Sequence, residues 1–315
     1  MRVFESLADV PAGVGPSAVT IGKFDGVHAG HRAVIGKLVE VARAEGLEAA
    51  VVTFDRNPLQ LLAPEKSPPD LVALDQKLEL LAGTGIDLAL VVAFDRAFAS
   101  QTPEEFVRRM LVDALGARVV LVGSDFRFGS RGAGTVDTLR QLGDELGFRV
   151  QLIDDVRPEE GRRVSSTWIR ELLAAGEVAH AARLLGHVPG VRGMVVHGAK
   201  RGRELGFPTA NLSPESEGLI PADGVYAGWL TDDGRRYPAA ISVGNNPTFE
   251  GVPQRQVEAY VLDEDLDLYD HRVKVSFAAR IRGMVAFEGV EPLIAQMTAD
   301  VQRARELLGM AGAQG

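Results

Sequence analysis

Two histidines with helical spacing offer the first candidate chemistry in this chain. His28 and His31 follow a loop punctuated by glycines, and that loop follows a short apolar run at 18–21. Apolar residues then recur with helical spacing up to Gly46, so the pattern predicts a buried strand, a turn and a helix. A helix N-terminus offers unsatisfied N–H donors and the positive end of a dipole, which favour phosphate. The spacing alone also fits a surface pair or a chance metal pair.

The chemistry that this loop suits is transfer of a nucleotidyl group. Positioning and charge stabilisation at the α-phosphate and the departing pyrophosphate can supply the catalysis without a covalent protein intermediate. We expect both imidazoles to act as charged donors to the phosphates. The chain contains no G-x-x-x-x-G-K-[ST] pattern, which excludes a Walker A loop.

A second loop with candidate chemistry follows another predicted strand of the first half. We expect it to lie near the histidines, at the carboxyl ends of the strands of one parallel sheet. Asp125, Phe126 and Phe128 follow a predicted strand that ends at Gly123. An acid and two aromatic rings there can contact a ring system and a phosphate. The same residues also fit an ordinary turn with a small aromatic core.

A further phosphate contact is expected from a later helix start. Ser166, Thr167 and Arg170 lie together where a helix is predicted to begin, and such a start favours anions. A plain serine or threonine cap with a solvated arginine explains the same residues equally well.

A basic loop at 198–211 carries the candidate chemistry of the second half. Thr209 and Asn211 alternate with Ala210, so in an extended chain they point the same way and present two oxygens together. Neutral oxygens combined with phosphate oxygens suit magnesium, which keeps several waters. An ordinary loop with a polar strand start is the alternative.

One carboxylate stands on a predicted strand of the second half. Glu258 has apolar neighbours in the segment 256–262. If its side chain faces a ligand cavity, it can accept a proton from a substrate hydroxyl. A glutamate that simply points to water is the alternative.

The first half shows apolar runs that alternate with amphipathic stretches. Strands are predicted at 17–21, 49–54, 88–94, 119–123 and 150–153. Helices are predicted at 31–45, 75–82, 103–115 and 135–146. The alternation predicts βαβ units in an open α/β sheet with helices on both faces, which binds its ligand at the carboxyl ends of the strands.

Beyond Pro189 the period changes to that of an all-β domain. Alternating runs predict strands at 191–197, 224–230, 237–243, 256–262 and 273–281, and this pattern is typical of an antiparallel barrel or sandwich. Apolar residues between Leu293 and Leu308 predict a C-terminal helix that covers the barrel. We therefore predict two domains, residues 1–186 and 187–315.

The composition limits the classes of protein. The chain has 315 residues, 46% hydrophobic residues and a net charge of −9, which argues against a nucleic-acid partner. It has no cysteine, no apolar run of bilayer length and no export signal, so we expect a cytoplasmic protein without membrane contact. The sequence leaves a homo-oligomer open.

The motifs in their order resemble those of the bacterial bifunctional riboflavin kinase/FMN adenylyltransferase family, also called FAD synthetase. The resemblance runs from about residue 17 to 308 and rests on segments in both halves. These segments are 22–31, 122–129, 165–170, 206–211, 224–228, 247–249, 257–258 and 267–269.

The resemblance implies a Rossmann-like nucleotidyltransferase domain followed by a Greek-key barrel with a C-terminal helix. The first domain would join FMN to ATP and release pyrophosphate and FAD. The barrel would phosphorylate the 5′-hydroxyl of riboflavin with ATP. Magnesium would serve both reactions.

The resemblance also implies roles for individual residues. His28 and His31 would be catalytic in the adenylyltransferase, and Glu258 would be the base of the kinase. The ATP and phosphate site of the adenylyltransferase would comprise Gly22, Phe24, His28, His31, Ser166, Thr167 and Arg170. Asp125, Phe126 and Phe128 would be its flavin neighbours. ATP and magnesium in the kinase would be bound by Gly198, Lys200, Gly206, Thr209 and Asn211, with Thr209 and Asn211 as the metal ligands.

Three positions depart from the pattern of the family. Asn57 stands where relatives often carry histidine, Asp125 stands where some carry asparagine, and Asp270 replaces a glycine that commonly follows Asp-Leu-Tyr. Two alternatives to a bifunctional enzyme remain open. In the first alternative, only one of the two domains is catalytically active. In the second, the chain is a flavin or nucleotide sensor without catalytic activity.

Overall fold

The structure is a computed structural model, and it describes residues 1–153, 161–198, 205–245 and 255–310. The chain forms two compact units, Met1–Ser165 and Ser166–Gly315. The predicted domain boundary at 186/187 stays a prediction, and the two helices at 166–185, which it assigns to the first domain, group with the barrel. Within the described ranges, no helix combines the length and the apolar character that crossing a bilayer requires.

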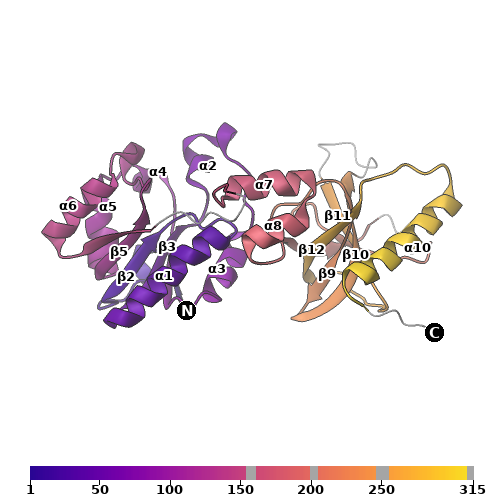
Figure 1. Cartoon of the computed structure of the whole chain (residues 1–315), viewed down its shortest axis with the longest axis horizontal. Coiled ribbons are helices and arrows are strands. Elements are labelled where there is room, and N and C mark those ends of the chain that lie inside the picture. The colour runs from indigo at the N-terminus through magenta and orange to yellow at the C-terminus, as the bar shows by residue number, and fades with distance from the viewer. Residues whose placement is uncertain (154–160, 199–204, 246–254, 311–315) are drawn as a thin grey trace. The chain divides into compact units, whose positions relative to one another are not determined.

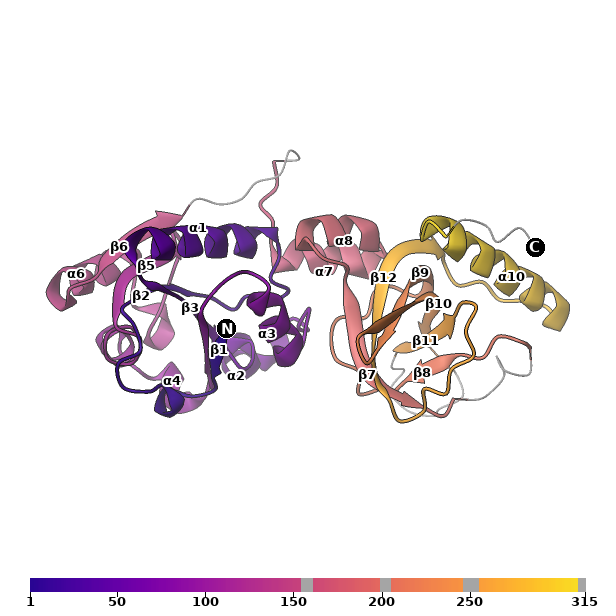
Figure 2. The ribbon, with the colours of Figure 1, turned by 90° about the horizontal axis from the view of Figure 1, so that it is seen from below.

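The first unit is built on a parallel sheet of six strands (Figures 1 and 2). The strands in chain order are β1 (Arg2–Phe4), β2 (Ser17–Ile21), β3 (Glu48–Phe54), β4 (Leu88–Val92), β5 (Ala117–Gly123) and β6 (Arg149–Ile153). Their order across the sheet is β1-β4-β3-β2-β5-β6. The five predicted strands are confirmed. The edge strand β1 was missed, because its three residues, two exposed and one half-buried, are too few to show a period.

Helices cover both faces of this sheet, as predicted for a doubly wound fold. They are α1 (Ala29–Glu45), α2 (Pro58–Leu62), α3 (Leu74–Ala82), α4 (Arg96–Ala99), α5 (Pro103–Phe106) and α6 (Val136–Leu146), with 3-10 turns η1 (Leu7–Asp9), η2 (Pro64–Lys66) and η4 (Ser130–Gly132). The single helix expected at 103–115 is wrong in detail. Its capping box at Thr102 is present, but the chain then becomes a π-helix, η3 (Val107–Ala114).

Two hydrophobic clusters lie on the opposite faces of the sheet. Neighbouring residues of β2 show the division, because Ala18 belongs to the cluster under α1 and α3, and Val19 belongs to the cluster under η3 and α6. Every residue of β2 is buried. A strand buried on both faces reads as a continuous apolar run, which is why the sequence predicted it well.

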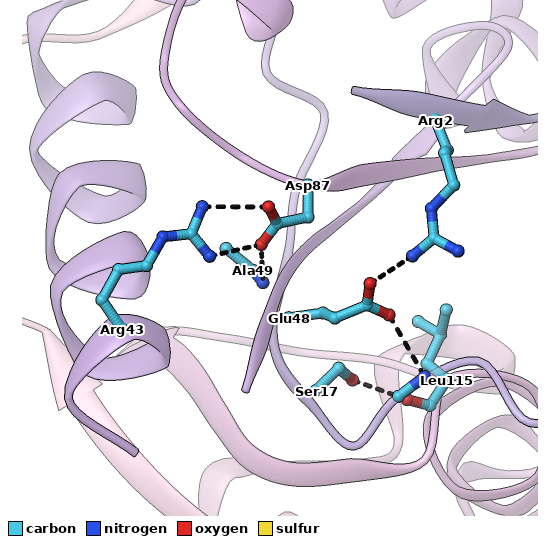
Figure 3. A network of polar contacts seen from close by, with 8 residues as sticks. Arg2, Ser17, Arg43, Glu48, Ala49, Asp87 and Leu115 are labelled. Carbon is cyan, nitrogen blue, oxygen red and sulfur yellow. Dashed lines mark hydrogen bonds and ion pairs between the residues drawn. The ribbon is translucent and has the colours of Figure 1, made fainter. Parts of the chain in front are cut away.

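Polar contacts tie the amino ends of the strands together (Figure 3). Asp87 accepts two hydrogen bonds from Arg43 of α1, at 2.6 and 2.9 Å, and one from the backbone N–H of Ala49 at 2.8 Å. Arg2 pairs with Glu48 on the neighbouring side. This network lies at the end of the sheet opposite to the carboxyl ends, so it supports the fold and leaves the other edge to a ligand.

The second unit begins with two helices, α7 (Ser166–Ala175) and α8 (Val178–Leu185). A closed barrel of six strands follows, in the order β10-β11-β8-β7-β12-β9. The strands are β7 (Gly190–Val196), β8 (Ala210–Leu212), β9 (Gly224–Asp232), β10 (Arg235–Asn245), β11 (Arg255–Val261) and β12 (Arg272–Arg282). Closure removes the exposed sheet edges. The five predicted strands are confirmed, and β8 is the short extended segment expected at Thr209–Asn211.

The C-terminal helix α10 (Val290–Leu307) packs on the outside of the barrel (Figure 2). Its Val301 and Ala304 join a small apolar cluster with Ala227 and Tyr260 of the strands. Two ion pairs fasten it, Arg282 with Asp300 and Asp263 with Arg305. The predicted covering helix is therefore confirmed.

Candidate active sites

The loop after β2 has an unusual backbone. The φ values of Phe24, Gly26 and Val27 are 48°, 79° and 41°. These values lie in the left-handed region, which residues other than glycine rarely adopt. Phe24 and Val27 are 2% and 0% exposed, so burial of these side chains stabilises a conformation that costs about 1 to 3 kcal/mol at each such residue. Such strain is characteristic of ligand-binding loops.

Side chains from other segments hold this loop in place. The backbone carbonyl of Lys23 accepts hydrogen bonds from Thr53 Oγ1 at 3.2 Å and from Lys77 Nζ at 3.4 Å. Lys77 Nζ also donates to the carbonyl of Phe54 at 2.7 Å. Asp25 Oδ1 accepts from the N–H of Leu71 at 2.9 Å. The loop is therefore preorganised at the carboxyl ends of β2 and β3.

The two histidines lie together where the loop becomes helix. His28 is the N-cap of α1, and its Nδ1 accepts a hydrogen bond from the backbone N–H of His31 at 3.3 Å. The rings stack, with centroids 3.6 Å apart and planes at 15°. A Cβ atom at Gly30 would lie 3.1 Å from the His28 ring. The predicted pair is thus formed, and glycine at position 30 leaves room for the ring.

Both histidines are neutral in the free protein at pH 7. Burial, and then the charge of Arg163, lowers the pKa of His28 to about 4. Burial lowers the pKa of His31 well below its usual value, and the neighbouring His28, Lys23, Arg163 and Lys77 lower it further. The expectation of charged imidazoles is therefore wrong for the free site. Since His28 Nδ1 accepts, its proton is assigned to Nε2, which can donate to a phosphate.

The site also contains unsatisfied buried nitrogens. Among the described residues, His31 Nδ1 and Arg32 Nε are buried without a hydrogen-bond partner. Such a group costs about 1 to 3 kcal/mol, and native proteins retain few of them. Their position in the first turn of α1 supports a ligand site there.

Asp125 belongs to the same region through an arginine that the sequence analysis missed. Arg163 Nη1 donates to Asp125 Oδ2 at 3.1 Å, and the same guanidinium lowers the pKa of His28. A pair of arginines just before Ser165 was the available signal. The aromatic residues of the loop differ from each other. Phe128 is 5% exposed and belongs to the core, and Phe126 stacks on it with centroids 5.5 Å apart.

The remaining residues considered for the adenylyltransferase site lie on helices other than α1. Ser166, Thr167 and Arg170 lie on α7, which belongs to the second compact unit, so their contribution to the histidine site stays a prediction. Asn57 caps α2, because its Oδ1 accepts from the N–H of Leu59 at 3.1 Å. That side chain therefore has a structural partner where relatives often carry histidine.

In the barrel, three predicted residues form one hydrogen-bonded group. Asn211 of β8 and Glu258 of β11 are cross-strand partners. Thr209 Oγ1 donates to Glu258 Oε2 at 3.4 Å, and Asn211 Nδ2 lies 3.2 Å from Thr209 Oγ1. A Cβ atom at Gly198 would lie 2.5 Å from the Asn211 side chain. Glycine at 198 is therefore needed for this close approach.

Two cavities meet at this group. The smaller, about 50 Å³, is lined by Gly198, Thr209 and Asn211. The larger, about 290 Å³, is lined by Thr209, Glu258 and mainly apolar side chains of the barrel and α10. Thr209 lines both. A donor and an acceptor bound in the two cavities would therefore meet between Thr209 and Glu258.

Burial affects Glu258 in the way that suits a base. Desolvation raises the pKa of Glu258, and the hydrogen bond from Thr209 acts in the opposite direction. A base with a raised pKa accepts a proton more readily near neutral pH. The sequence alone could not tell this arrangement from a glutamate in water.

The donor set fits magnesium bound partly by a nucleotide. Thr209 and Asn211, which each carry a side-chain oxygen, line the smaller cavity, and the carboxylate of Glu258 is hydrogen-bonded to Thr209. No group of three or more His, Asp or Glu side chains that could hold a metal occurs among the residues the structure describes. Magnesium commonly uses few protein ligands together with phosphates and water.

The other predicted kinase residues have separate outcomes. Lys200 lies outside the described residues. Gly206 has a φ of 87°, which explains the glycine in the Gly-Phe-Pro-Thr-Ala-Asn motif. Asp270, which replaces a glycine of the family pattern, also has a positive φ of 62°. The turn therefore keeps a left-handed residue without the glycine.

Fold and site together define a class of protein. A doubly wound sheet presents a strained loop and a helix N-terminus at its carboxyl edge, and a closed barrel presents a half-buried carboxylate beside a threonine that lines two cavities. This combination is that of a two-unit transferase that handles nucleotides.

Comparison with known proteins identifies the family. The FAD synthetase family model matches residues 12–168, and the riboflavin kinase model matches residues 185–308. Together with the 40% identity to a bifunctional relative over 93% of each chain, these matches show that the chain belongs to the bifunctional riboflavin kinase/FMN adenylyltransferase family and carries both the FAD synthetase and the riboflavin kinase domains.

Relatives cover almost the whole chain. The bifunctional riboflavin kinase/FMN adenylyltransferase of Escherichia coli K12 is 40% identical over 293 residues, which are 93% of each chain. That of Bacillus subtilis is 34% identical, and the match covers 91% of each chain. A crystal structure titled as a macrolide-efflux protein from Streptococcus pneumoniae superposes with a TM-score of 0.85 at 33% identity, covering 96% of this chain and 98% of that one.

Proposed function

We propose that the barrel phosphorylates riboflavin through Thr209, Asn211 and Glu258. The ribityl 5′-hydroxyl oxygen attacks the γ-phosphorus of ATP, the bond to ADP breaks, and Glu258 accepts the hydroxyl proton. The apolar cavity of about 290 Å³ holds the flavin ring, and the smaller cavity receives the phosphates. Magnesium held by Thr209 and Asn211 would neutralise charge on the phosphates.

In the α/β unit, adenylyl transfer follows from the loop and the histidine pair. A phosphate oxygen of FMN attacks the α-phosphorus of a second ATP, and pyrophosphate leaves. Neutral His28 donates from Nε2, and the backbone N–H groups at the start of α1 stabilise the charge that develops on the phosphates. Ser166, Thr167 and Arg170 complete the phosphate site. Asp125 and Phe126 lie on the flavin side, and Phe128 supports Phe126 from the core.

The observation that carries the proposal is that Thr209 lines both cavities and is hydrogen-bonded to the half-buried carboxylate of Glu258. The test is incubation of the full chain with riboflavin, ATP and magnesium, followed by chromatography of the flavins. We expect FMN and then FAD, and neither with EDTA in place of the metal. FMN alone, or FAD only from supplied FMN, means that one site works. Flavin binding without either product means a sensor.

We further propose small-molecule substrates as the partners and the cytoplasm as the location. The net charge of −9 supports the absence of a nucleic-acid partner. Cell fractionation tests the location, and sedimentation of the purified chain tests the homo-oligomer that the sequence leaves open.

A further inference from the structure

An ion pair lines the larger, mainly apolar cavity of the barrel unit. Arg282 Nη2 lies 2.6 Å from Asp300 Oδ2, and Nε lies 2.9 Å from Oδ1. The side chains are only 21% and 6% exposed, and both line the cavity of about 290 Å³. Removing two charges from water is costly, so a buried ion pair gives little net stability. A role in recognition explains its retention better.

The strand register places this pair relative to Glu258. Cross-strand partners form one row over five strands: Asn211, Glu258, Ser242, Val225 and Arg282. Directly opposite residues share one face of a sheet, and all but Asn211 line the larger cavity. Neighbouring strands lie about 4.8 Å apart. Glu258 and Arg282 are therefore about 14 Å apart along the sheet.

We propose that Arg282, oriented by Asp300, determines flavin specificity by binding the pyrimidine edge of the isoalloxazine ring. This inference rests on the proposed kinase reaction. Riboflavin has two carbonyl groups on that edge, an apolar opposite edge and a ribityl chain that ends in the reacting hydroxyl. The part of the row that lines the cavity has a cationic donor, Arg282, at one end and the base, Glu258, at the other. The flavin is thereby oriented with its 5′-hydroxyl at Glu258.

The guanidinium has donors left for a ligand. Within the described residues, Nε and Nη2 donate to Asp300, and Nη1 donates to the carbonyl of Gly283 at 3.0 Å. An arginine has five N–H donors, so two remain. Gln296 Nε2 also donates to Asp300 Oδ1 at 2.9 Å. The carboxylate is therefore held from two sides and keeps the guanidinium in one orientation.

The competing explanation is that the pair only fastens α10 to the barrel. The chain offers a matched control, because Asp263 and Arg305 form a second ion pair with α10, and neither lines the cavity. Removal of either pair takes one fastening from the same helix. Only the removal of Arg282 and Asp300 takes polar groups from the cavity wall.

The experiment compares two double variants of the full chain, Arg282→Met with Asp300→Leu and Arg305→Met with Asp263→Leu. Steady-state kinase kinetics are measured with riboflavin and with 3-methylriboflavin, which carries a methyl group between the two carbonyls. We expect the first variant to raise the KM for riboflavin about 10- to 100-fold, the loss expected for hydrogen bonds to a charged group. The KM for ATP stays unchanged. The wild type should prefer riboflavin over the methylated flavin, and this variant should lose the preference.

The control variant should keep both the KM and the preference. Equal rises of KM in the two variants, or an unchanged preference in the first, would overturn the inference. If the first variant does not fold, Arg282→Lys decides the question, because it keeps the charge but loses the paired donors. That variant should also lose the preference. A wild type that forms no FMN at all contradicts the kinase assignment itself, which is a different outcome from any of these.

Discussion

In the function that we propose, the two units control phosphate charge with different parts of the chain. The α/β unit uses backbone N–H groups and two neutral rings at a helix start. The barrel uses side chains that cross-strand register brings together. Burial acts in opposite directions on the pKa values, because it lowers those of the histidines and raises that of Glu258. In both cases burial favours the neutral form, so each imidazole keeps one N–H donor and one acceptor nitrogen, and the ionised carboxylate of Glu258 becomes a stronger proton acceptor.

The sharpest test of this comparison is the loss of the carboxylate. Glu258→Gln keeps the shape of the side chain but cannot accept the proton, so riboflavin phosphorylation should fall about 10²- to 10⁴-fold. FAD formation from supplied FMN should remain at the wild-type rate. Separate assays of the two steps measure this. Glu215→Gln, at an exposed position, is the control and should change neither rate.

Removal of the ring pair should produce the opposite pattern. His28→Ala together with His31→Ala removes the donors to the phosphates and the N-cap of α1, and FAD formation should fall at least about 10²-fold. FMN should still accumulate from riboflavin. Chromatography of the products measures both. Equal loss of FMN formation in a folded variant contradicts the assignment of two independent sites.

A smaller effect is expected from a single methyl group. In Gly30→Ala the new Cβ meets the His28 ring at 3.1 Å, so the stacked pair must shift by a few tenths of an ångström. Misplaced groups commonly cost up to about 10²-fold in rate, and we expect a drop of about tenfold in FAD formation alone. Gly36→Ala in the same helix meets nothing within 4 Å. It should leave both rates unchanged and raise stability by about 0.5 to 1 kcal/mol.

The pH profiles should separate the two sites. Glu258 acts ionised, so kcat/KM of the kinase should fall as the pH falls through its pKa, which burial raises above the usual value. The histidines act neutral, and since the pKa of His28 is about 4, kcat/KM for FAD formation should show no histidine inflection between about pH 5 and 8. An inflection near the ordinary histidine pKa of about 6.5 would mean that the free rings are charged.

The smallest expected effect concerns the turn at Asp270, a residue that lines neither cavity of the barrel. Asp270 has a φ of 62°, where glycine has no steric cost. Asp270→Gly should therefore leave both activities unchanged and raise the free energy of unfolding by at most about 1 kcal/mol. Thermal or denaturant unfolding measures it. A destabilised variant would show that the Asp270 side chain makes a contact that outweighs the strain.

The sequence by itself determined both folds and the main chemistry. Strands such as β2 are buried on both faces and β11 is half buried, so their apolar periods are visible without any tertiary information. The histidine pair and the segment Thr209–Asn211 also depend on local spacing alone. Where local signals were weak, the prediction failed, as for the edge strand β1 and the π-helix η3.

Only the tertiary structure decided the ionisation and the contacts of the site residues, because these depend on residues far away in the chain. It placed both rings where burial lowers their pKa values, and it brought up Arg163, from a distant part of the chain, which lowers both further. It placed Glu258 against Thr209, 49 residues away in the chain, and it brought Arg282 and Asp300 to the wall of the same cavity. Burial and register are properties of the packed chain, so no periodicity within one segment can reveal them. The residue types were visible from the sequence, but their ionisation and their partners were not.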